Sequence, residues 1–213
     1  METKPYLIAL DLDGTLLKDD KTISESSSDV IRKLREDGHY VCISTGRPFR
    51  ASSVYYDQLQ LDTPIVNFNG AFVHHPKDQS WGRFHTSLDL EVVKQIIEVS
   101  ETYNVHNILA EIVDDVYFHY HDEKLIDVFT MGSPNITVGD LRTNLGQDVT
   151  SVLIHAKEED VPAIRSYLSD VHAEMVDHRR WAAPWHVIEL IKSGINKACL
   201  LYTSDAADDS LRV

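Results

Sequence analysis

The sequence predicts an α/β fold with two parts: a Rossmann-like parallel-sheet core that is incomplete, and an inserted α/β cap domain. In the first part, short apolar runs alternate with amphipathic helical segments as far as Asn69-Gly70, and this alternation is typical of a parallel sheet with crossover helices. After Asn69-Gly70 the pattern changes to a hairpin and a second α/β series. With 213 residues, of which 43% are hydrophobic, the chain can bury such a core without disulfides.

The expected core begins with the apolar strand Tyr6–Leu10, which ends in acidic residues. A helix follows over Ser24–Asp37, because its apolar residues share one face and Gly38 is a typical stop signal. The remaining elements of this βαβαβ start are a strand at Tyr40–Ser44, a helix near Ser52–Leu59 and a strand at Pro64–Asn67.

The expected cap begins near Trp81, within a hairpin formed by Ala71–His75 and the stretch around Arg83–His85. Leu90 to Val99 has helical spacing of its apolar residues. The pattern then predicts strands at Ile108–Ile112, Val116–His121, Ser151–Ala156 and Ala173–Val176, and a helix at Glu159–Ser169 with Pro162 in its first turn. The predicted domains are therefore a core of residues 1–80 and 187–213 and a cap of residues 81–186.

Composition excludes several classes of function. The formal net charge of −14 would repel a nucleic-acid backbone, and no local basic patch offsets it. No apolar run approaches the ~20 residues that span a bilayer, and no secretion signal opens the chain, so we expect a cytoplasmic protein without a membrane partner. Cys42 and Cys199 lie in apolar stretches and are expected to be buried hydrophobes. The pairs His74–His75 and His119–His121 lack the spacing of a zinc site.

The strongest chemical signal is the segment Asp11-Leu12-Asp13-Gly14-Thr15 at the end of the first strand. A calcium loop also begins Asp-x-Asp, but it needs glycine at position six and glutamate at position twelve, where this sequence has Leu16 and Thr22. A plain solvated turn is the other alternative. The carboxyl ends of parallel strands form the ligand crevice of such sheets, which favours a catalytic pair of carboxylates.

A second polar motif, Ser44-Thr45-Gly46-Arg47-Pro48, follows the second strand and reaches the same edge of the sheet. It supplies a hydroxyl group and a glycine that allows backbone N–H groups to approach an anion closely. Alone, the motif fits an ordinary helix cap as well as a phosphate site. Its distance of one crossover from Asp11 and Asp13 favours the phosphate site.

Two further segments complete a family resemblance. Asn69-Gly70-Ala71 follows the third strand, and Val187–Lys197 returns the chain through a strand and the segment Gly194-Ile-Asn-Lys197. Together with the first two motifs, they make residues 5 to about 201 resemble the Cof-type branch of the haloacid dehalogenase (HAD) superfamily. The resemblance implies a magnesium-dependent phosphatase that forms an aspartyl-phosphate and acts on a small phosphorylated metabolite, such as a sugar phosphate.

The resemblance also assigns roles to residues. Asp11 becomes the nucleophile and Asp13 the general acid and then base, and Asp11 with the backbone carbonyl of Asp13 would bind Mg²⁺. Thr45 would bind the phosphoryl oxygens, and Lys197 would neutralise them. The substrate-binding residues expected in the core are Gly14, Thr15, Gly46, Arg47 and Asn69. In the cap, Arg179, Arg180, Trp181 and Trp185 are candidates for substrate contact, although such a cluster is as often a packed loop.

The sequence departs from the family at its C-terminal end. The family's fourth motif, Gly-Asp followed by Asn-Asp or Asp-Asp, is missing, and the acidic segment Ser204–Asp209 follows Lys197 too closely for a crossover connection. We therefore expect that the natural protein is longer, and that the first strand lies at an open edge of the sheet. Two alternatives stay open: a phosphosugar mutase on the same scaffold, and a catalytically silent phosphoester-binding fragment.

Overall fold

The computed structural model describes residues 4–103, 105–181 and 185–198. The chain divides into two compact units, of which unit 1 comprises Met1–His85 and Asn196–Val213 and unit 2 comprises Thr86–Ile195. Both division points lie later in the chain than the predicted domain limits at residues 80 and 187. The strand Arg83–His85 pairs within unit 1 and the strand Val187–Lys192 pairs within unit 2, which explains both differences.

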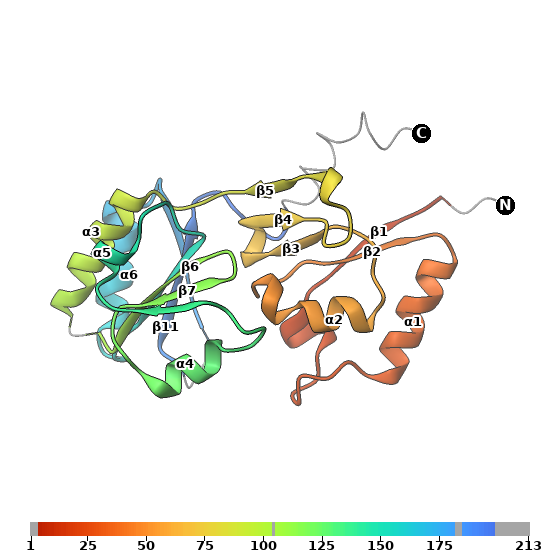
Figure 1. The fold of residues 1–213 in the computed structure, drawn as a ribbon, viewed down its shortest axis with the longest axis horizontal. Coiled ribbons are helices and arrows are strands. Elements are labelled where there is room, and N and C mark those ends of the chain that lie inside the picture. The colour runs from red at the N-terminus through yellow and green to blue at the C-terminus, as the bar shows by residue number, and fades with distance from the viewer. Residues whose placement is uncertain (1–3, 104, 182–184, 199–213) are drawn as a thin grey trace. The chain divides into compact units, whose positions relative to one another are not determined.

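Unit 1 begins with β1 (Leu7–Leu10), which pairs in parallel with β2 (Tyr40–Ile43) so that Leu10 lies opposite Ile43. The crossover between them contains α1 (Glu25–Glu36), whose N-terminus is capped by the Ser24 hydroxyl. Next come α2 (Ser53–Gln58) and β3 (Ile65–Asn67), and a parallel bridge between Ser44 and Val66 joins β3 to the end of β2. These elements confirm the predicted βαβαβ start (Figure 1).

A hairpin follows β3. The strands β3, β4 (Phe72–His74) and β5 (Arg83–His85) form one antiparallel sheet. Because β5 is paired to β4, it stays with unit 1, and the first division point falls after His85 and not near Trp81. The predicted hairpin is confirmed.

The apolar core of unit 1 lies between its helices and strands, with Leu12, Ile43, Tyr56, Leu61 and Ile65 fully buried. Among the described residues, β1 pairs with β2 alone, and its Leu7 is 42% exposed. Burial raises the pKa of the Cys42 thiol to about 12, which fits the predicted role of this residue as a small core hydrophobe. Cys199, with the same expectation, lies outside the described residues.

Unit 2 contains one sheet whose described strands have the order β10-β11-β9-β6-β7-β8. All neighbouring pairs are antiparallel except β7 and β8, which are parallel. The strands are β6 (Asn107–Ile112), β7 (Asp115–Phe118), β8 (Ile136–Val138), β9 (Ser151–His155), β10 (Val176–Arg180) and β11 (Val187–Lys192).

Two features of this sheet differ from the expectation. The strand expected at Ala173–Val176 is wrong: β10 starts at Val176, because the preceding residues form a turn in which the Met175 and Val176 amides donate to the His172 carbonyl. The segment expected to re-enter the core is β11, which lies between β9 and β10 in unit 2. The second division point therefore follows β11.

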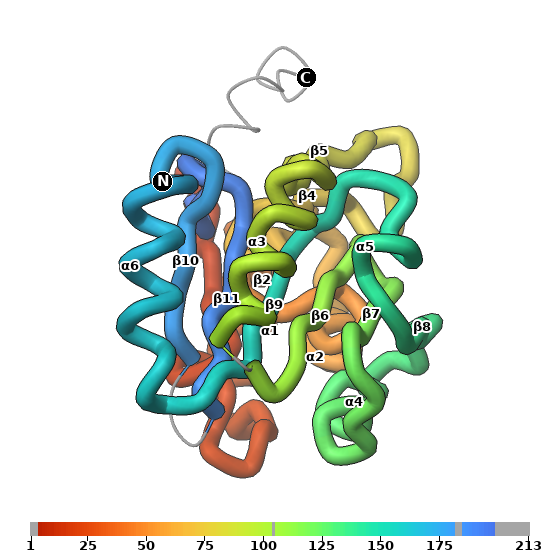
Figure 2. The backbone as a smooth tube through the Cα atoms, turned by 90° about the vertical axis from the view of Figure 1, so that its left-hand side faces the viewer, coloured from red at the N-terminus to blue at the C-terminus, as the bar shows by residue number. Residues whose placement is uncertain are grey.

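Helices pack against both faces of the unit 2 sheet, and one of these faces is turned toward the viewer in Figure 2. One face, which carries Ile108 and Ala110 of β6, packs against α3 (Leu90–Thr102), α5 (Leu141–Asn144) and α6 (Val161–Val171). The opposite face, which carries Leu109, packs against α4 (Glu123–Phe129). The elements α4, β8 and α5 were not predicted from the sequence, because elements of three to seven residues show too little periodicity to be recognised.

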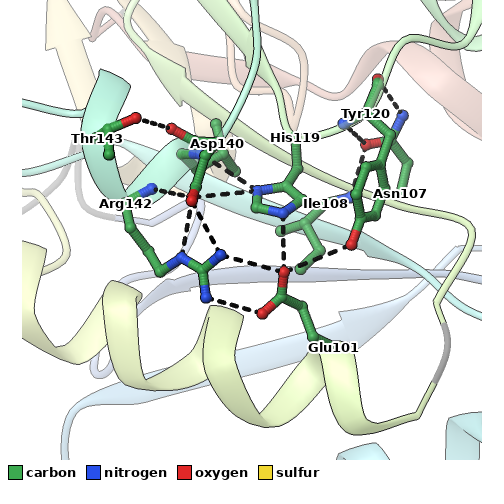
Figure 3. Close-up of polar contacts among 9 residues, drawn as sticks. Glu101, Asn107, Ile108, His119, Tyr120, Asp140, Arg142 and Thr143 are labelled. Carbon is green, nitrogen blue, oxygen red and sulfur yellow. Dashed lines mark hydrogen bonds and ion pairs between the residues drawn. The ribbon is translucent and has the colours of Figure 1, made fainter.

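A polar network fixes the end of α3 to the sheet of unit 2 (Figure 3). The Glu101 carboxylate lies 2.9 Å from His119 Nε2 at the end of β7, and its other oxygen accepts a hydrogen bond from Arg142 of α5 at 2.9 Å. Arg142 also donates to Asp140, which caps the N-terminus of α5. The buried His119 ring is therefore held by carboxylate and backbone partners, so His119 has a structural explanation here.

None of the helices in the described parts of the chain is long and apolar enough to cross a membrane.

Candidate active site

Asp11 lies directly after β1 and caps a wide turn at Leu12–Leu16, in which the Leu16 amide donates to the Asp11 carbonyl. Its Oδ1 accepts a hydrogen bond from the Leu12 amide at 2.9 Å, and its Oδ2 lies 2.7 Å from the ammonium of Lys197. The carboxylate is only partly buried, with 32% of its side chain exposed. One carboxylate oxygen is thus held by the backbone and the other faces a cation at the carboxyl end of a parallel strand, which is the expected place for a ligand.

Asp13 points to different partners. Arg47 donates from Nε to Oδ2 at 2.6 Å and from Nη2 to Oδ1 at 2.8 Å, and the Lys21 ammonium lies 2.9 Å from Oδ1. The hydrogen bonds from Arg47 hold the pKa of the Asp13 carboxyl well below its usual range, and Lys21 adds to this effect, although partial burial opposes it. In this arrangement Asp13 is a carboxylate.

The loop after β2 joins the turn after β3. The Asn69 amide donates to the Thr45 carbonyl at 3.0 Å, and the Thr45 hydroxyl accepts from the Arg47 amide at 3.2 Å. Thr45 and Asn69 are both buried. Asn69 has φ of +55°, a left-handed conformation that asparagine tolerates better than most residues. The loop therefore places Thr45 and Arg47 beside the end of β1, as the sequence predicts for a shared sheet edge.

Gly46 is needed for this loop to approach Asn69. A Cβ atom at Gly46 would lie 3.1 Å from both Oδ1 and Nδ2 of Asn69, which is closer than ordinary van der Waals contact. Because Asn69 is buried and its backbone is left-handed, its side chain has little room to retreat.

We expect the variant Gly46→Ala to lower the free energy of unfolding by about 1–3 kcal/mol, the usual effect of overpacking. Urea unfolding followed by circular dichroism measures this change. Gly146→Ala is the matched control, because a Cβ atom there meets nothing within 4 Å. Gly38→Ser is unsuitable as a control, because Gly38 has φ of +84° and a side chain there would strain the backbone. Unchanged stability of Gly46→Ala would contradict the tight packing described here.

Lys197 is anchored through its own backbone. Its carbonyl oxygen accepts a hydrogen bond at 2.8 Å from the hydroxyl of Ser44, which is buried at the end of β2. The β1–β2 register places Ser44 beside the end of β1, and its amide donates to the Leu10 carbonyl. The Ser44 hydroxyl thus holds the backbone of Lys197 near Asp11.

Other residues of the predicted site are placed less tightly. Gly14, with φ of +73°, allows the turn after Asp13, and Thr15 is exposed on the same turn. The acidic segment Ser204–Asp209 lies outside the described residues. The cap candidates lie in unit 2, where the Trp181 indole donates to Glu189 at 3.2 Å and Arg180 lies 3.5 Å from Glu158. A substrate role for the cap residues stays a prediction.

Sequence reasoning missed Lys21, Ser44 and Tyr55 as contributors to this site. Lys21 contacts Asp13, Ser44 holds Lys197, and the Tyr55 ring lies under the Arg47 guanidinium at 5.4 Å. Ser44 lies next to Thr45, so the motif itself was a signal for it. Nothing in the sequence pattern distinguishes Lys21 from other surface lysines.

The oxygen donors at the end of β1 suit a magnesium ion. Mg²⁺ takes one or two protein carboxylates and completes its shell with waters and phosphate oxygens. Asp11 supplies a partly exposed carboxylate, and the backbone of Asp13 supplies a carbonyl group on the same turn. In the described part of the chain, no cluster of three or more His, Cys, Asp or Glu side chains could hold a metal ion.

The chain is similar to known phosphatases. A family model for haloacid dehalogenase-like hydrolases matches residues 8–203. The 5-amino-6-(5-phospho-D-ribitylamino)uracil phosphatase YitU of Bacillus subtilis (strain 168) is 79% identical over 198 residues, which cover 93% of the chain and 73% of that protein. The pyridoxal phosphate phosphatase YbhA of Escherichia coli (strain K12) is 35% identical over 122 residues, covering 54% of the chain and 41% of that protein.

The fold is also similar to solved structures. A haloacid dehalogenase-like hydrolase from Bacteroides thetaiotaomicron superposes with a TM-score of 0.79 at 22% identity, over 97% of the chain and 77% of that structure. At this identity the likeness concerns the fold alone.

Proposed function

The chain belongs to the haloacid dehalogenase-like hydrolases, and we propose that it is a magnesium-dependent phosphatase that removes the phosphate of 5-amino-6-(5-phospho-D-ribitylamino)uracil through an aspartyl-phosphate on Asp11. The observation that carries the chemical part is the Asp11 carboxylate, which lies at the end of β1 with the Lys197 ammonium 2.7 Å away. The substrate is proposed from the 79% identity to YitU.

In the first step, a carboxylate oxygen of Asp11 forms a bond to phosphorus while the bond between phosphorus and the ester oxygen breaks. The departing ester oxygen takes a proton from Asp13, and the negative phosphoryl oxygens are stabilised by Lys197 and the Thr45 hydroxyl. Asp13 is a carboxylate in the present arrangement, so it must leave its two cations and take up a proton before this step.

In the second step, water attacks the phosphorus of the aspartyl-phosphate, Asp13 accepts the proton of that water, and the bond to Asp11 breaks to release inorganic phosphate. The carboxylate form of Asp13, which the hydrogen bonds from Arg47 and Lys21 favour by lowering its pKa, is the form that this step needs. Asp11 and the Asp13 carbonyl would hold Mg²⁺, which, when bound, offsets the mutual repulsion of the carboxylate and the phosphate.

We expect phosphate release from 5-amino-6-(5-phospho-D-ribitylamino)uracil to depend on Mg²⁺ and to exceed that from pyridoxal phosphate and from a hexose phosphate at equal concentration. A phosphate-release assay with and without a chelator measures this. A preference for another ester would overturn the proposed substrate alone. Transfer between sugar positions without net phosphate release would support the mutase alternative, and folded protein without any turnover would support the silent phosphoester-binding alternative.

A further inference from the structure

We propose that Lys21 is a positioning residue for Asp13, held in place by Tyr55. This inference rests on the proposed phosphatase function, because it assigns Lys21 a part in that reaction. Three contacts within unit 1 carry it: the Lys21 ammonium on the Asp13 carboxylate, the Tyr55 hydroxyl on the Lys21 backbone, and the Arg47 guanidinium between Asp13 and the Tyr55 ring.

Lys21 lies in a small hairpin after the catalytic turn. The hairpin is closed by a bridge between Leu17 and Ile23, and its backbone is tied further by a hydrogen bond from the Lys18 amide to the Thr22 carbonyl at 3.0 Å. Within it Lys21 has φ of +61°, an uncommon conformation for a lysine. Non-glycine residues keep such a conformation where their surroundings enforce it.

Tyr55 supplies that enforcement. Its hydroxyl donates to the Lys21 carbonyl at 2.9 Å, and its ring is buried in the core of unit 1. The same ring lies 5.4 Å from the Arg47 guanidinium, near enough for a cation–π contact. One buried side chain of α2 therefore orients both cations that contact Asp13.

The two cations do not have the same task. Arg47 already pairs with both oxygens of Asp13, and Lys21 adds a second donor to Oδ1, at 2.9 Å. The Lys21 and Asp13 side chains are 60% and 44% exposed, and ion pairs with that exposure contribute little to stability. A second, strained donor on one oxygen restricts the direction of the carboxylate, and this geometric effect matters in the second step, where the Asp13 carboxylate accepts a proton from the attacking water.

The variant Lys21→Met is expected to lower kcat about tenfold with KM changed by less than about twofold, because misplaced proton-transfer groups slow the chemical step. Lys21→Arg, which keeps a cation and its donors, should recover most of kcat. Tyr55→Phe, which removes only the hydroxyl, should lower kcat in the same direction. Lys18→Met is the matched control, because Lys18 lies in the same hairpin and pairs with Asp20, and its kcat should equal that of the unsubstituted chain.

Two results would overturn the inference. The first is an unchanged kcat in Lys21→Met. The second is a fold loss of kcat of the same size when Lys21→Met is added to Asp13→Asn, because a positioning effect on the Asp13 carboxylate should vanish in that variant. Thermal unfolding of each variant identifies any loss of kcat that comes from misfolding. If Lys21→Met misfolds, the inference is tested by the kcat of Lys21→Arg, which should remain close to that of the unsubstituted chain.

A carbodiimide cross-link tests the contact without enzyme activity. In the unsubstituted chain we expect an amide between Lys21 and Asp13, detected by mass spectrometry of tryptic peptides, with the link between Lys197 and Asp11 as an internal control at 2.7 Å. Absence of the first link beside the second would overturn the positioning role alone. A chain that forms both links and hydrolyses no phosphate ester would overturn the proposed function, and with it the part of Lys21 in catalysis.

Discussion

Replacing Asp11 with asparagine is expected to lower phosphate release by about three orders of magnitude or more, the loss typical of a removed nucleophile. The asparagine amide keeps the size and the hydrogen bond to the Leu12 amide, but it cannot form the bond to phosphorus. It also leaves the Lys197 ammonium without its partner carboxylate oxygen at 2.7 Å. The loss should appear in kcat, because the covalent step itself is blocked.

The measurement is phosphate release from 5-amino-6-(5-phospho-D-ribitylamino)uracil at saturating Mg²⁺. Asp29→Asn is the matched control, since Asp29 is an exposed aspartate of α1 that pairs with Arg32. That variant should keep full activity, and both variants should unfold at nearly the temperature of the unsubstituted chain. Substantial turnover by folded Asp11→Asn protein would contradict the assignment of the nucleophile and direct attention to Asp13.

The sequence was sufficient for the part of the site that depends on regular elements. The strands β1, β2 and β3 could be predicted from apolar runs, and parallel strands bring their carboxyl ends together, so Asp11, Thr45 and Asn69 could be assigned to one sheet edge. The predicted fold class and the family resemblance are confirmed. The expectation that the natural protein is longer stays a prediction.

The sequence did not predict which partner each side chain of the site contacts. Asp11 and Asp13 are two residues apart, yet one pairs with Lys197 and the other with Arg47 and Lys21. No periodicity encodes that choice, because it depends on the turn at Gly14 and on the hairpin after it. This pairing affects the chemistry, because Asp13, which is expected to act first as a general acid, is a carboxylate paired with two cations.

The misplaced strand has a similar physical cause. Ala173–Val176 is moderately apolar, whereas β10 carries Asp177, His178, Arg179 and Arg180, which a strand prediction disfavours. The strand β10 forms nevertheless, because it pairs with the apolar β11 and such tertiary contacts override the weak local preference. The same pairing holds β11 in unit 2.

Lys197→Met is expected to lower kcat by about two to three orders of magnitude, the usual cost of removing a charge that stabilises a transition state. The attack joins a carboxylate to a phosphate dianion, and two unit charges 4 Å apart repel by about 1–4 kcal/mol between the dielectric limits of water and a protein surface. The Lys197 ammonium, 2.7 Å from Asp11, offsets this repulsion, whereas the methionine side chain of similar length cannot. The large loss of kcat should come with little change in the free energy of unfolding, because a partly exposed ion pair contributes little to stability.

The design separates charge from structure. Lys192→Met, at the exposed end of β11, is the control for loss of a lysine and should keep full activity. Lys197→Arg should recover part of kcat, because it restores the charge with a different shape. Adding Lys197→Met to Asp11→Asn should cost nothing further, since both act on the same bond-forming step. A kcat within about threefold of the unsubstituted chain in Lys197→Met would show that the cation beside Asp11 is not what stabilises the transferring phosphoryl group.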